Sequence, residues 1–306
     1  MLTFFTTAKP FRGHDGIIQR NGLQSWKLLD PEVEVILFGD EAGAAEASAE
    51  LGLRHEPHVE RYQGKMPYVN FLFRRAQEIA RHDYLCYSNC DIVLSNDFLN
   101  AFKKARAWRQ RFLMISRRWD TDVTEPIDFS SASWALELRK LALTTGFQQD
   151  EHFMDLFLFT KGLFLDVLPL IVGYCYWDDW MIWKALNTGV AVLDCSSFAL
   201  AVHQNHGYTT TPERFKGSNL EPLSMRNMEI VGGWEHIRNI RDATHRLTRR
   251  GWIVPNPARL ARPWEERYRP MLQHLVCSLW NPIWFFFLDM TRPVRSVLGL
   301  RSKANR

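Results

Sequence analysis

The sequence predicts a doubly wound α/β fold, in which a largely parallel sheet is flanked by helices. The first observation is that short apolar, β-branched runs alternate with segments of helical periodicity through the first two thirds of the 306 residues. The second is that polar or charged residues follow the ends of these runs, where ligands bind in such sheets. The third is the composition, with 46% AVILMFWYC and 24% charged residues. This composition excludes disordered, collagen-like and multi-span membrane chains, and a chain of this length needs no disulfides to form a core.

Each predicted strand is a short apolar run bounded by turn residues. We expect strands over residues 2–7, 33–38, 53–57, 84–94, 112–116, 157–160 and 191–194. The predicted helices are a segment over 16–29, an Ala/Glu-rich segment that ends at Gly52, and a segment after Pro67 whose apolar positions keep helical spacing as far as Ala80.

The net charge of +4 divides unevenly along the chain. Residues 235–306 contain 14 Lys+Arg and 5 Asp+Glu, whereas residues 1–234 contain 24 and 29. We therefore expect a main domain over 1–234 and a basic, aromatic helical extension over 235–306.

The extension combines arginines with aromatic residues. Its apolar run over 275–288 is broken by an Asn-Pro pair and is shorter than the ~20 residues that span a bilayer. Trp264, Trp280 and Trp284 among arginines fit a segment, 264–301, that attaches to a membrane surface. They fit equally a helical subdomain that packs on the core or on a dimer partner, so the oligomeric state stays open. The apolar run is too continuous for a solvated groove, which disfavours nucleic-acid binding.

The five cysteines are scattered and form no C-x-x-C pair, so a disulfide framework or structural zinc site is not expected. The first residues lack the basic region of a secretory signal. These features predict a cytoplasmic protein, which would lie at the inner face of the membrane if the extension binds lipid. The G-x-G-x-x-G and G-x-x-x-x-G-K-[ST] loops are also missing from the sequence, which disfavours the common nucleotide-binding modes.

Asn89 and Asp91 interrupt an otherwise apolar strand signal. A carboxylate in that setting is costly unless a cation or several donors satisfy it. A divalent ion that bridges Asp91 and a diphosphate would do so. The alternative is an aspartate that ends the strand and caps the next turn.

Two histidines, His203 and His206, follow a strand-like segment three residues apart. Imidazoles in such a segment can ligate a metal. A surface or hydrogen-bonded structural histidine is the alternative interpretation.

Two adjacent carboxylates, Asp178 and Asp179, lie between Trp177 and Trp180 at a predicted helix start. A helix cap explains them simply. A carboxylate that the rings partly desolvate could instead have a raised pKa and act as a general base.

In order and spacing, these motifs over about residues 1–208 resemble the GT-A-type nucleotide-sugar glycosyltransferases, in particular those of bacterial capsule and O-antigen polysaccharides. Residues 88–91 occupy the place of the family's D-x-D motif, with Asn89 in place of the first aspartate. The resemblance implies a GT-A-like domain over 1–234 with a donor-binding half over about 1–120 and an acceptor-binding half over about 121–234. It implies Mn²⁺ or Mg²⁺ held by Asp91 and by His203 or His206.

The resemblance and the positions at strand ends also give the remaining expected roles. Donor contacts are expected from Thr6, Thr7, Lys9, Asp40, Asn89, Asp91, Arg117 and Arg118. Acceptor stacking is expected from the three rings next to the proposed site, Trp119, Trp177 and Trp180. Asp179, preferred over Asp178, would be the base of an inverting reaction, and Asp155 would compete if configuration is retained.

The expected activity is therefore transfer of a sugar from a nucleotide donor to a hydroxyl of a growing, lipid-linked glycan. Two rival functions use the same residues. One is a metal-dependent phosphoesterase or nucleotidyltransferase built on Asp91 and the histidines. The other is a non-catalytic scaffold of a polysaccharide assembly complex, in which Asn89 marks a lost metal site.

Overall fold

The computed structural model describes residues 1–207 and 221–260. The chain forms one compact unit over Met1–Asn256 and a second over Pro257–Arg306. The first unit runs past the predicted boundary at residue 234, because two strands that follow it, β14 (His245–Leu247) and β15 (Ile253–Pro255), belong to the main sheet. The predicted membrane-attaching segment 264–301 lies outside the described residues.

A nine-stranded sheet forms the centre of the first unit, in the order β15-β14-β12-β8-β11-β6-β1-β2-β3. The strands not yet delimited are β1 (Leu2–Thr7), β2 (Glu34–Phe38), β3 (Arg54–Glu56), β6 (Tyr84–Ser88), β8 (Phe112–Ile115), β11 (Leu156–Thr160) and β12 (Ala191–Asp194). Within this sheet β11 and β15 run antiparallel to their neighbours, and the other pairings are parallel. The predicted mostly parallel α/β architecture is therefore confirmed.

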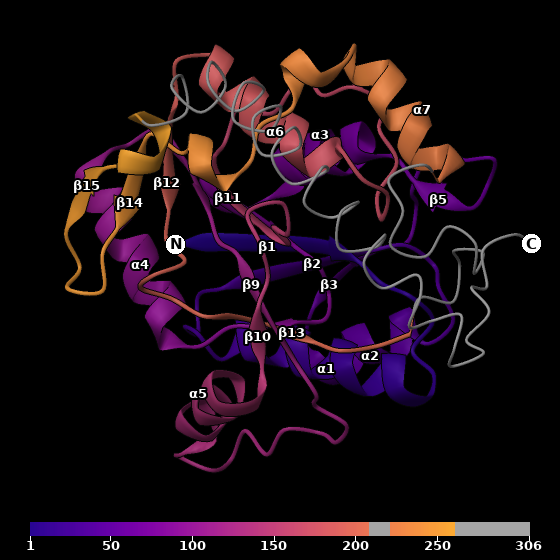
Figure 1. Cartoon of the computed structure of the whole chain (residues 1–306). Coiled ribbons are helices and arrows are strands. Elements are labelled where there is room, and N and C mark those ends of the chain that lie inside the picture. The colour runs from indigo at the N-terminus through magenta and orange to yellow at the C-terminus, as the bar shows by residue number, and fades with distance from the viewer. Residues whose placement is uncertain (208–220, 261–306) are drawn as a thin grey trace, which may run out of the picture. The chain divides into compact units, whose positions relative to one another are not determined.

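Helices cover both faces of this sheet (Figure 1). Each face has its own apolar cluster. On one face α3 and α6 pack around Phe73, and on the other α1 and α4 pack around Trp26. Strands buried on both faces are mainly apolar, which explains why their runs show no regular alternation of polar and apolar residues. The helices are α1 (Gly13–Lys27), α2 (Ala44–Leu51), α3 (Val69–Ile79), α4 (Asn96–Trp108), α5 (Trp134–Thr145), α6 (Trp177–Asn187) and α7 (Pro222–Val231), with short 3₁₀ turns at Trp234–His236 and Ile240–Asp242.

A second, four-stranded sheet follows the order β10-β9-β13-β7. It contains β7 (Ile92–Val93), β9 (Arg118–Thr121), β10 (Phe147–Gln148) and β13 (Ala201–Gln204), and a separate hairpin pairs β4 (Arg61–Tyr62) with β5 (Met66–Pro67). The prediction of one strand over 84–94 is therefore wrong, because β6 ends in the large sheet and β7 begins in the small one. The chain passes between the two sheets at residues 89–91.

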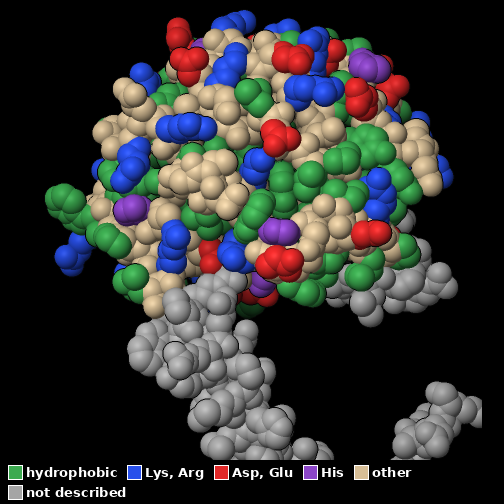
Figure 2. Space-filling model, turned by 90° about the horizontal axis from the view of Figure 1, so that it is seen from above, with side chains coloured by type: hydrophobic (Ala, Val, Ile, Leu, Met, Phe, Trp, Pro, Cys, Tyr) green, Lys and Arg blue, Asp and Glu red, His purple; other side chains and the backbone are tan. Residues whose placement is uncertain are grey.

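The outer surface over α6 and α7 mixes acidic, basic and apolar side chains (Figure 2). In the ranges 1–207 and 221–260, no helix combines the length and the apolar character needed to span a bilayer.

Candidate metal and donor site

Asp91 lies in the link between the two sheets, and hydrogen bonds hold this link from several sides. Its backbone carbonyl accepts from both the backbone N and the Nε2 of Gln204, at 3.3 and 3.0 Å. The backbone N of Asn89 donates to the carbonyl of Asp155 at 3.0 Å, and Trp26 Nε1 donates to the carbonyl of Ile92 at 2.9 Å. The position of the Asp91 carboxylate is thus set by strand β13, by the chain before β11 and by helix α1.

Helix α1 approaches the link so closely that only glycine fits at position 22. A Cβ on Gly22 would lie 2.2 Å from the carbonyl oxygen of Cys90 and 3.2 Å from that of Ile92. Ser25, one helical turn on, accepts a hydrogen bond from the backbone N of Leu94 at 3.1 Å. The N-terminal helix therefore forms one wall behind the Asp91 link.

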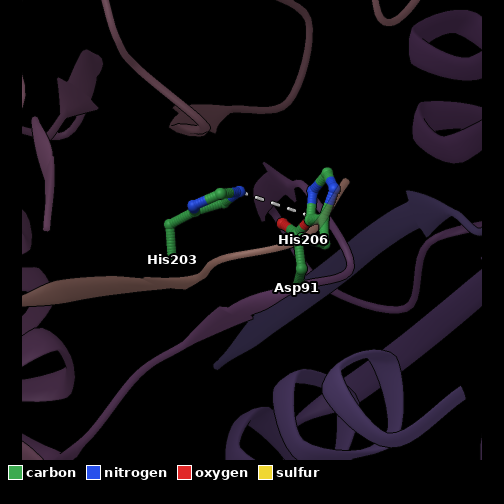
Figure 3. A group of neighbouring side chains, drawn as sticks. All are labelled: Asp91, His203 and His206. Atoms are coloured by element: carbon green, nitrogen blue, oxygen red, sulfur yellow. Dashed lines mark hydrogen bonds and ion pairs between the residues drawn. The ribbon is translucent and has the colours of Figure 1, made fainter. Parts of the chain in front are cut away.

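Asp91, His203 and His206 gather with one ligand atom each, all within 4.8 Å of one another. Asp91 Oδ2 lies 3.0 Å from Nε2 of His206 and 3.7 Å from Nε2 of His203. Both imidazole rings turn toward the carboxylate (Figure 3). The second oxygen, Asp91 Oδ1, is buried and has no hydrogen-bond partner among the described residues. Asp91 and both candidate histidines therefore lie together, and their binding of a metal stays a prediction.

The charges around Asp91 favour its ionised form. Burial opposes ionisation, but the hydrogen bond with His206 and the charges of His203, His206 and Arg118 outweigh it and lower the pKa of Asp91. The same hydrogen bond is the main cause of a raised pKa at His206. A protonated His206 therefore supplies, next to the Asp91 carboxylate, the positive charge that a bound cation would otherwise supply.

These three side chains fit a divalent cation. A carboxylate with one buried, unpartnered oxygen and two convergent imidazoles is a donor set for borderline divalent metals. A fourth group, the ammonium of Lys9, lies 3.0 Å from Nδ1 of His206, and the carbonyl of Gly207 lies 3.2 Å from the same nitrogen. A cation that binds Nε2 of His206 would displace any proton from that nitrogen.

Asn89, in place of the first acid of the D-x-D motif, turns to a carboxylate. Its Nδ2 donates to Oδ1 of Asp155 at 2.7 Å, and its Oδ1 accepts from the hydroxyl of Tyr87 at 3.1 Å. The other oxygen of Asp155 accepts from Arg118 NH1 at 2.6 Å. Both oxygens of Asp155 are therefore held by short hydrogen bonds.

Asp120 was absent from the sequence prediction and completes this polar group. Its Oδ1 lies 2.8 Å from Nε of Arg118 and 3.1 Å from Nδ1 of His203, and its Oδ2 accepts from Gln149 at 2.6 Å. Burial opposes ionisation of Asp120, yet the contacts with His203 and Arg118 lower its pKa to about 2. The only available signal was its spacing of two from Arg118 on an extended segment, which places both on one face of β9.

The two adjacent carboxylates at the start of α6 turn to different surroundings. Asp179 is 6% exposed and its Oδ1 contacts Nδ1 of His152 at 3.3 Å. Asp178 is half-buried, and burial, with the charges of Asp179 and Asp155, raises its pKa well above the usual range. The charge of Asp178 also contributes, after burial and other carboxylates, to the raised pKa of Tyr87. Asp178 therefore lies on the side of Asn89 and Asp155, and Asp179 on the side of His152.

The predicted acceptor rings are packed into the protein. Trp177 and Trp180 are 5% and 3% exposed and belong to the cluster under α3 and α6. The ring of Trp177 meets that of Tyr87 at 5.2 Å between centroids. Trp119 is half-buried and packs on the small apolar cluster between β9 and α5. Little ring surface is left for stacking at the two α6 tryptophans.

The remaining predicted donor residues lie at strand ends, but do not all meet the metal group. Thr6 is fully buried, and its hydroxyl donates a hydrogen bond to the backbone carbonyl of Thr7. The side chain of Thr7 is half-buried. Asp40 is largely exposed and pairs with Arg61 at 3.0 Å. Arg117 turns to the other half of the sheet, where its charge acts on Asp194. Of this set, Lys9 contacts the metal group directly.

Fold and site together define an α/β protein with a candidate divalent-metal centre where the chain crosses between two sheets. No protein-family model matches the chain, and no curated protein matches it by sequence.

Among solved structures, the chain is similar to a glucosyl-3-phosphoglycerate synthase of Mycobacterium tuberculosis, with 12% identity, 76% of this chain and 79% of that one covered, and a TM-score of 0.46. A complex of that synthase with Mn²⁺, UDP and phosphoglyceric acid matches with 11% identity, the same coverage and a TM-score of 0.46. Residues 1–349 of TarS from S. aureus match with 12% identity, 68% and 59% coverage and a TM-score of 0.39. Likeness at these identities and scores assigns no activity and no residue role to this chain.

Proposed function

We propose that this protein transfers a sugar from a nucleotide-activated donor to an acceptor hydroxyl with the help of a divalent cation. The observation that carries the proposal is the convergence of His203 and His206 on Oδ2 of Asp91, whose other oxygen is buried and has no hydrogen-bond partner among the described residues. The group follows the carboxyl end of β6, where α/β sheets bind their ligands. Within this group, Asp91 has the place in the chain of the last aspartate of the D-x-D motif.

Each residue of the group has a task that follows from its contacts. Asp91, His203 and His206 would hold Mn²⁺ or Mg²⁺, and Lys9, 3.0 Å from His206, would add a second positive charge toward an anionic ligand. A divalent ion bound there would neutralise the diphosphate of the departing nucleotide. The side chains themselves contribute orientation, because the link that carries Asp91 is fixed by hydrogen bonds from Gln204 and Trp26.

Asp178 is the better candidate for the general base than Asp179. Burial raises the pKa of Asp178 well above its usual range, which is the direction that a general base needs, and the charge of Asp155, which accepts from Asn89, adds to this shift. Asp179 already pairs with His152. Asp155 is a poor nucleophile because both of its oxygens accept short hydrogen bonds. These contacts support an inverting reaction with one carboxylate base.

Calorimetry with UDP, GDP, CDP and CMP, each with and without Mn²⁺, tests the proposal. Metal-enhanced binding of one nucleoside diphosphate supports it, and a mass-spectrometric screen of activated sugars then identifies the donor. Release of phosphate or pyrophosphate without any acceptor sugar would instead identify a phosphoesterase or nucleotidyltransferase. A protein that binds neither metal nor nucleotide would be a scaffold.

We further propose that the acceptor is a lipid-linked glycan and that residues 264–301 attach the protein to the membrane. The arginines and tryptophans of that segment support this proposal. Flotation with anionic liposomes tests it. Equal recovery of the full chain and of a chain ending after Asn256, the last residue of the first compact unit, would remove it.

A further inference from the structure

A ring of polar side chains connects the candidate metal ligands to the end of the large sheet. It runs from Asp91 to His203 at 3.7 Å, from His203 to Asp120 at 3.1 Å, and from Asp120 to Arg118 at 2.8 Å. Arg118 then reaches Asp155 at 2.6 Å, and Asp155 accepts from Asn89, two residues before Asp91. The ring therefore closes on the link that carries Asp91.

The strand register places Asp120 beside His203. These two residues are paired partners of the parallel strands β9 and β13, so their side chains leave the same face of the small sheet. The imidazole of His203 is 5% exposed. Its Nδ1 lies 3.1 Å from Asp120 Oδ1, but neither atom has an aligned hydrogen bond among the described residues, so a small turn of the ring is needed to point the Nδ1 proton at Asp120. Asp120 is thus the one described group that can orient this ring from behind.

The carboxylate of Asp120 is itself fixed. Gln149 donates to its Oδ2 at 2.6 Å, and the backbone N of Gln149 donates to the carbonyl of Arg118 at 3.0 Å. Arg118, whose side chain is 9% exposed, lies between Asp120 and Asp155. The two partly buried carboxylates and the buried guanidinium between them form a continuous ion-pair group.

We infer that Asp120 is a positioning residue, which keeps the Nδ1 proton of His203 on its own side and so presents the Nε2 lone pair to a cation at Asp91. This inference rests on the proposed metal site. A carboxylate behind a ligating histidine fixes the tautomer and the ring orientation and makes the ligating nitrogen more basic. Without a cation, the lone pair on Nε2 of His203 faces the Asp91 carboxylate at 3.7 Å, and the two repel each other. A cation bound between them would make the same arrangement favourable.

The test is a double-mutant cycle on Mn²⁺ affinity, measured with the full chain by calorimetry and by electron paramagnetic resonance of free Mn²⁺. Asp120→Asn keeps the shape and removes the charge, and we expect its Mn²⁺ affinity to fall about 10- to 100-fold. In a His203→Ala background the same substitution should have no further effect, because Asp120 acts through His203. Thermal unfolding of each variant reports on folding separately.

The outcomes separate the two proposals. Unchanged Mn²⁺ affinity in a folded Asp120→Asn protein, or losses that simply add to that of His203→Ala, would overturn the positioning role. If Asp120→Asn does not fold, Gln149→Ala is the second variant, because it removes only the hydrogen bond to Oδ2 of Asp120. A loss of Mn²⁺ affinity in Gln149→Ala that is absent when the substitution is made in the His203→Ala background would still support the positioning role. An unchanged affinity in folded Gln149→Ala would count against it in that case. A wild-type protein that binds no Mn²⁺ would overturn the metal site itself, and the positioning role with it.

Discussion

Replacing Gly22 with alanine is expected to displace the link that carries Asp91. The added Cβ would lie 2.2 Å from the carbonyl oxygen of Cys90, whereas ordinary contacts begin at 3.4 Å, so the helix or the link must move by about 1.2 Å. Overpacking of this kind costs about 3 kcal/mol at the upper end, and the gain in helix propensity from glycine to alanine returns about 1 kcal/mol. We therefore expect a net loss of about 2 kcal/mol in the free energy of unfolding, or a fall of about 4–8 °C in Tm.

The same displacement should reach the metal site. Metal–ligand distances tolerate only a few tenths of an ångström, so a shift of the Asp91 link should weaken Mn²⁺ binding by about tenfold. Calorimetric Mn²⁺ titration and thermal unfolding measure the two effects on one sample. Gly207→Ala is the matched control, since its Cβ would meet nothing within 4 Å although it adjoins His206. If Gly22→Ala has the Tm and the Mn²⁺ affinity of this control, the close packing of α1 does not position Asp91.

Three further predictions concern the ligands and the base. Asp91→Asn should lose roughly 100-fold or more in Mn²⁺ affinity with its fold retained, whereas Asp166→Asn, which changes an exposed carboxylate outside the group of candidate ligands, should bind Mn²⁺ normally in the same titration. The pKa of His206 is raised, and a metal must displace the proton of this histidine. Mn²⁺ affinity should therefore rise by about tenfold per pH unit until the pH exceeds that pKa. An Mn²⁺ affinity that does not change from pH 6 to 8 would contradict this prediction. Asp178→Asn should retain nucleotide and Mn²⁺ binding while losing turnover, and Asp179→Asn should keep most of the turnover. The reverse pattern in a donor-consumption assay would return the base to Asp179.

Local patterns predict the first half of the fold closely. The run at residues 2–7 forms β1 with the same bounds, and Gly52 ends α2 in the left-handed conformation expected of a C-terminal glycine. The apolar positions of the segment after Pro67 form the buried face of α3. Each of these features depends on contacts close in sequence, or on a face that must be buried whatever covers it.

Contacts between distant segments could not be predicted in the same way. The apolar run over 84–94 looks continuous, but β6 pairs with β1 and β11 whereas β7 pairs with β13, and nothing in the run itself indicates the change of partner. Asp120 could not be recognised because its partner, His203, is 83 residues away and is reached only through the register of two strands in the small sheet. The three candidate ligands could be singled out because each is an unusual residue in its own segment.

Because the candidate metal ligands lie where the chain crosses between the two sheets, binding of a cation would affect the local stability of the small sheet. The four strands of the small sheet are only two to four residues long, so few backbone bonds secure them. One ligand precedes β7, another lies on β13, and the third follows β13 by two residues. Cation occupancy would brace this sheet against the large one, and slower amide exchange in β9 and β13 would be its signature. Loss of the cation would then lower the local stability of the small sheet.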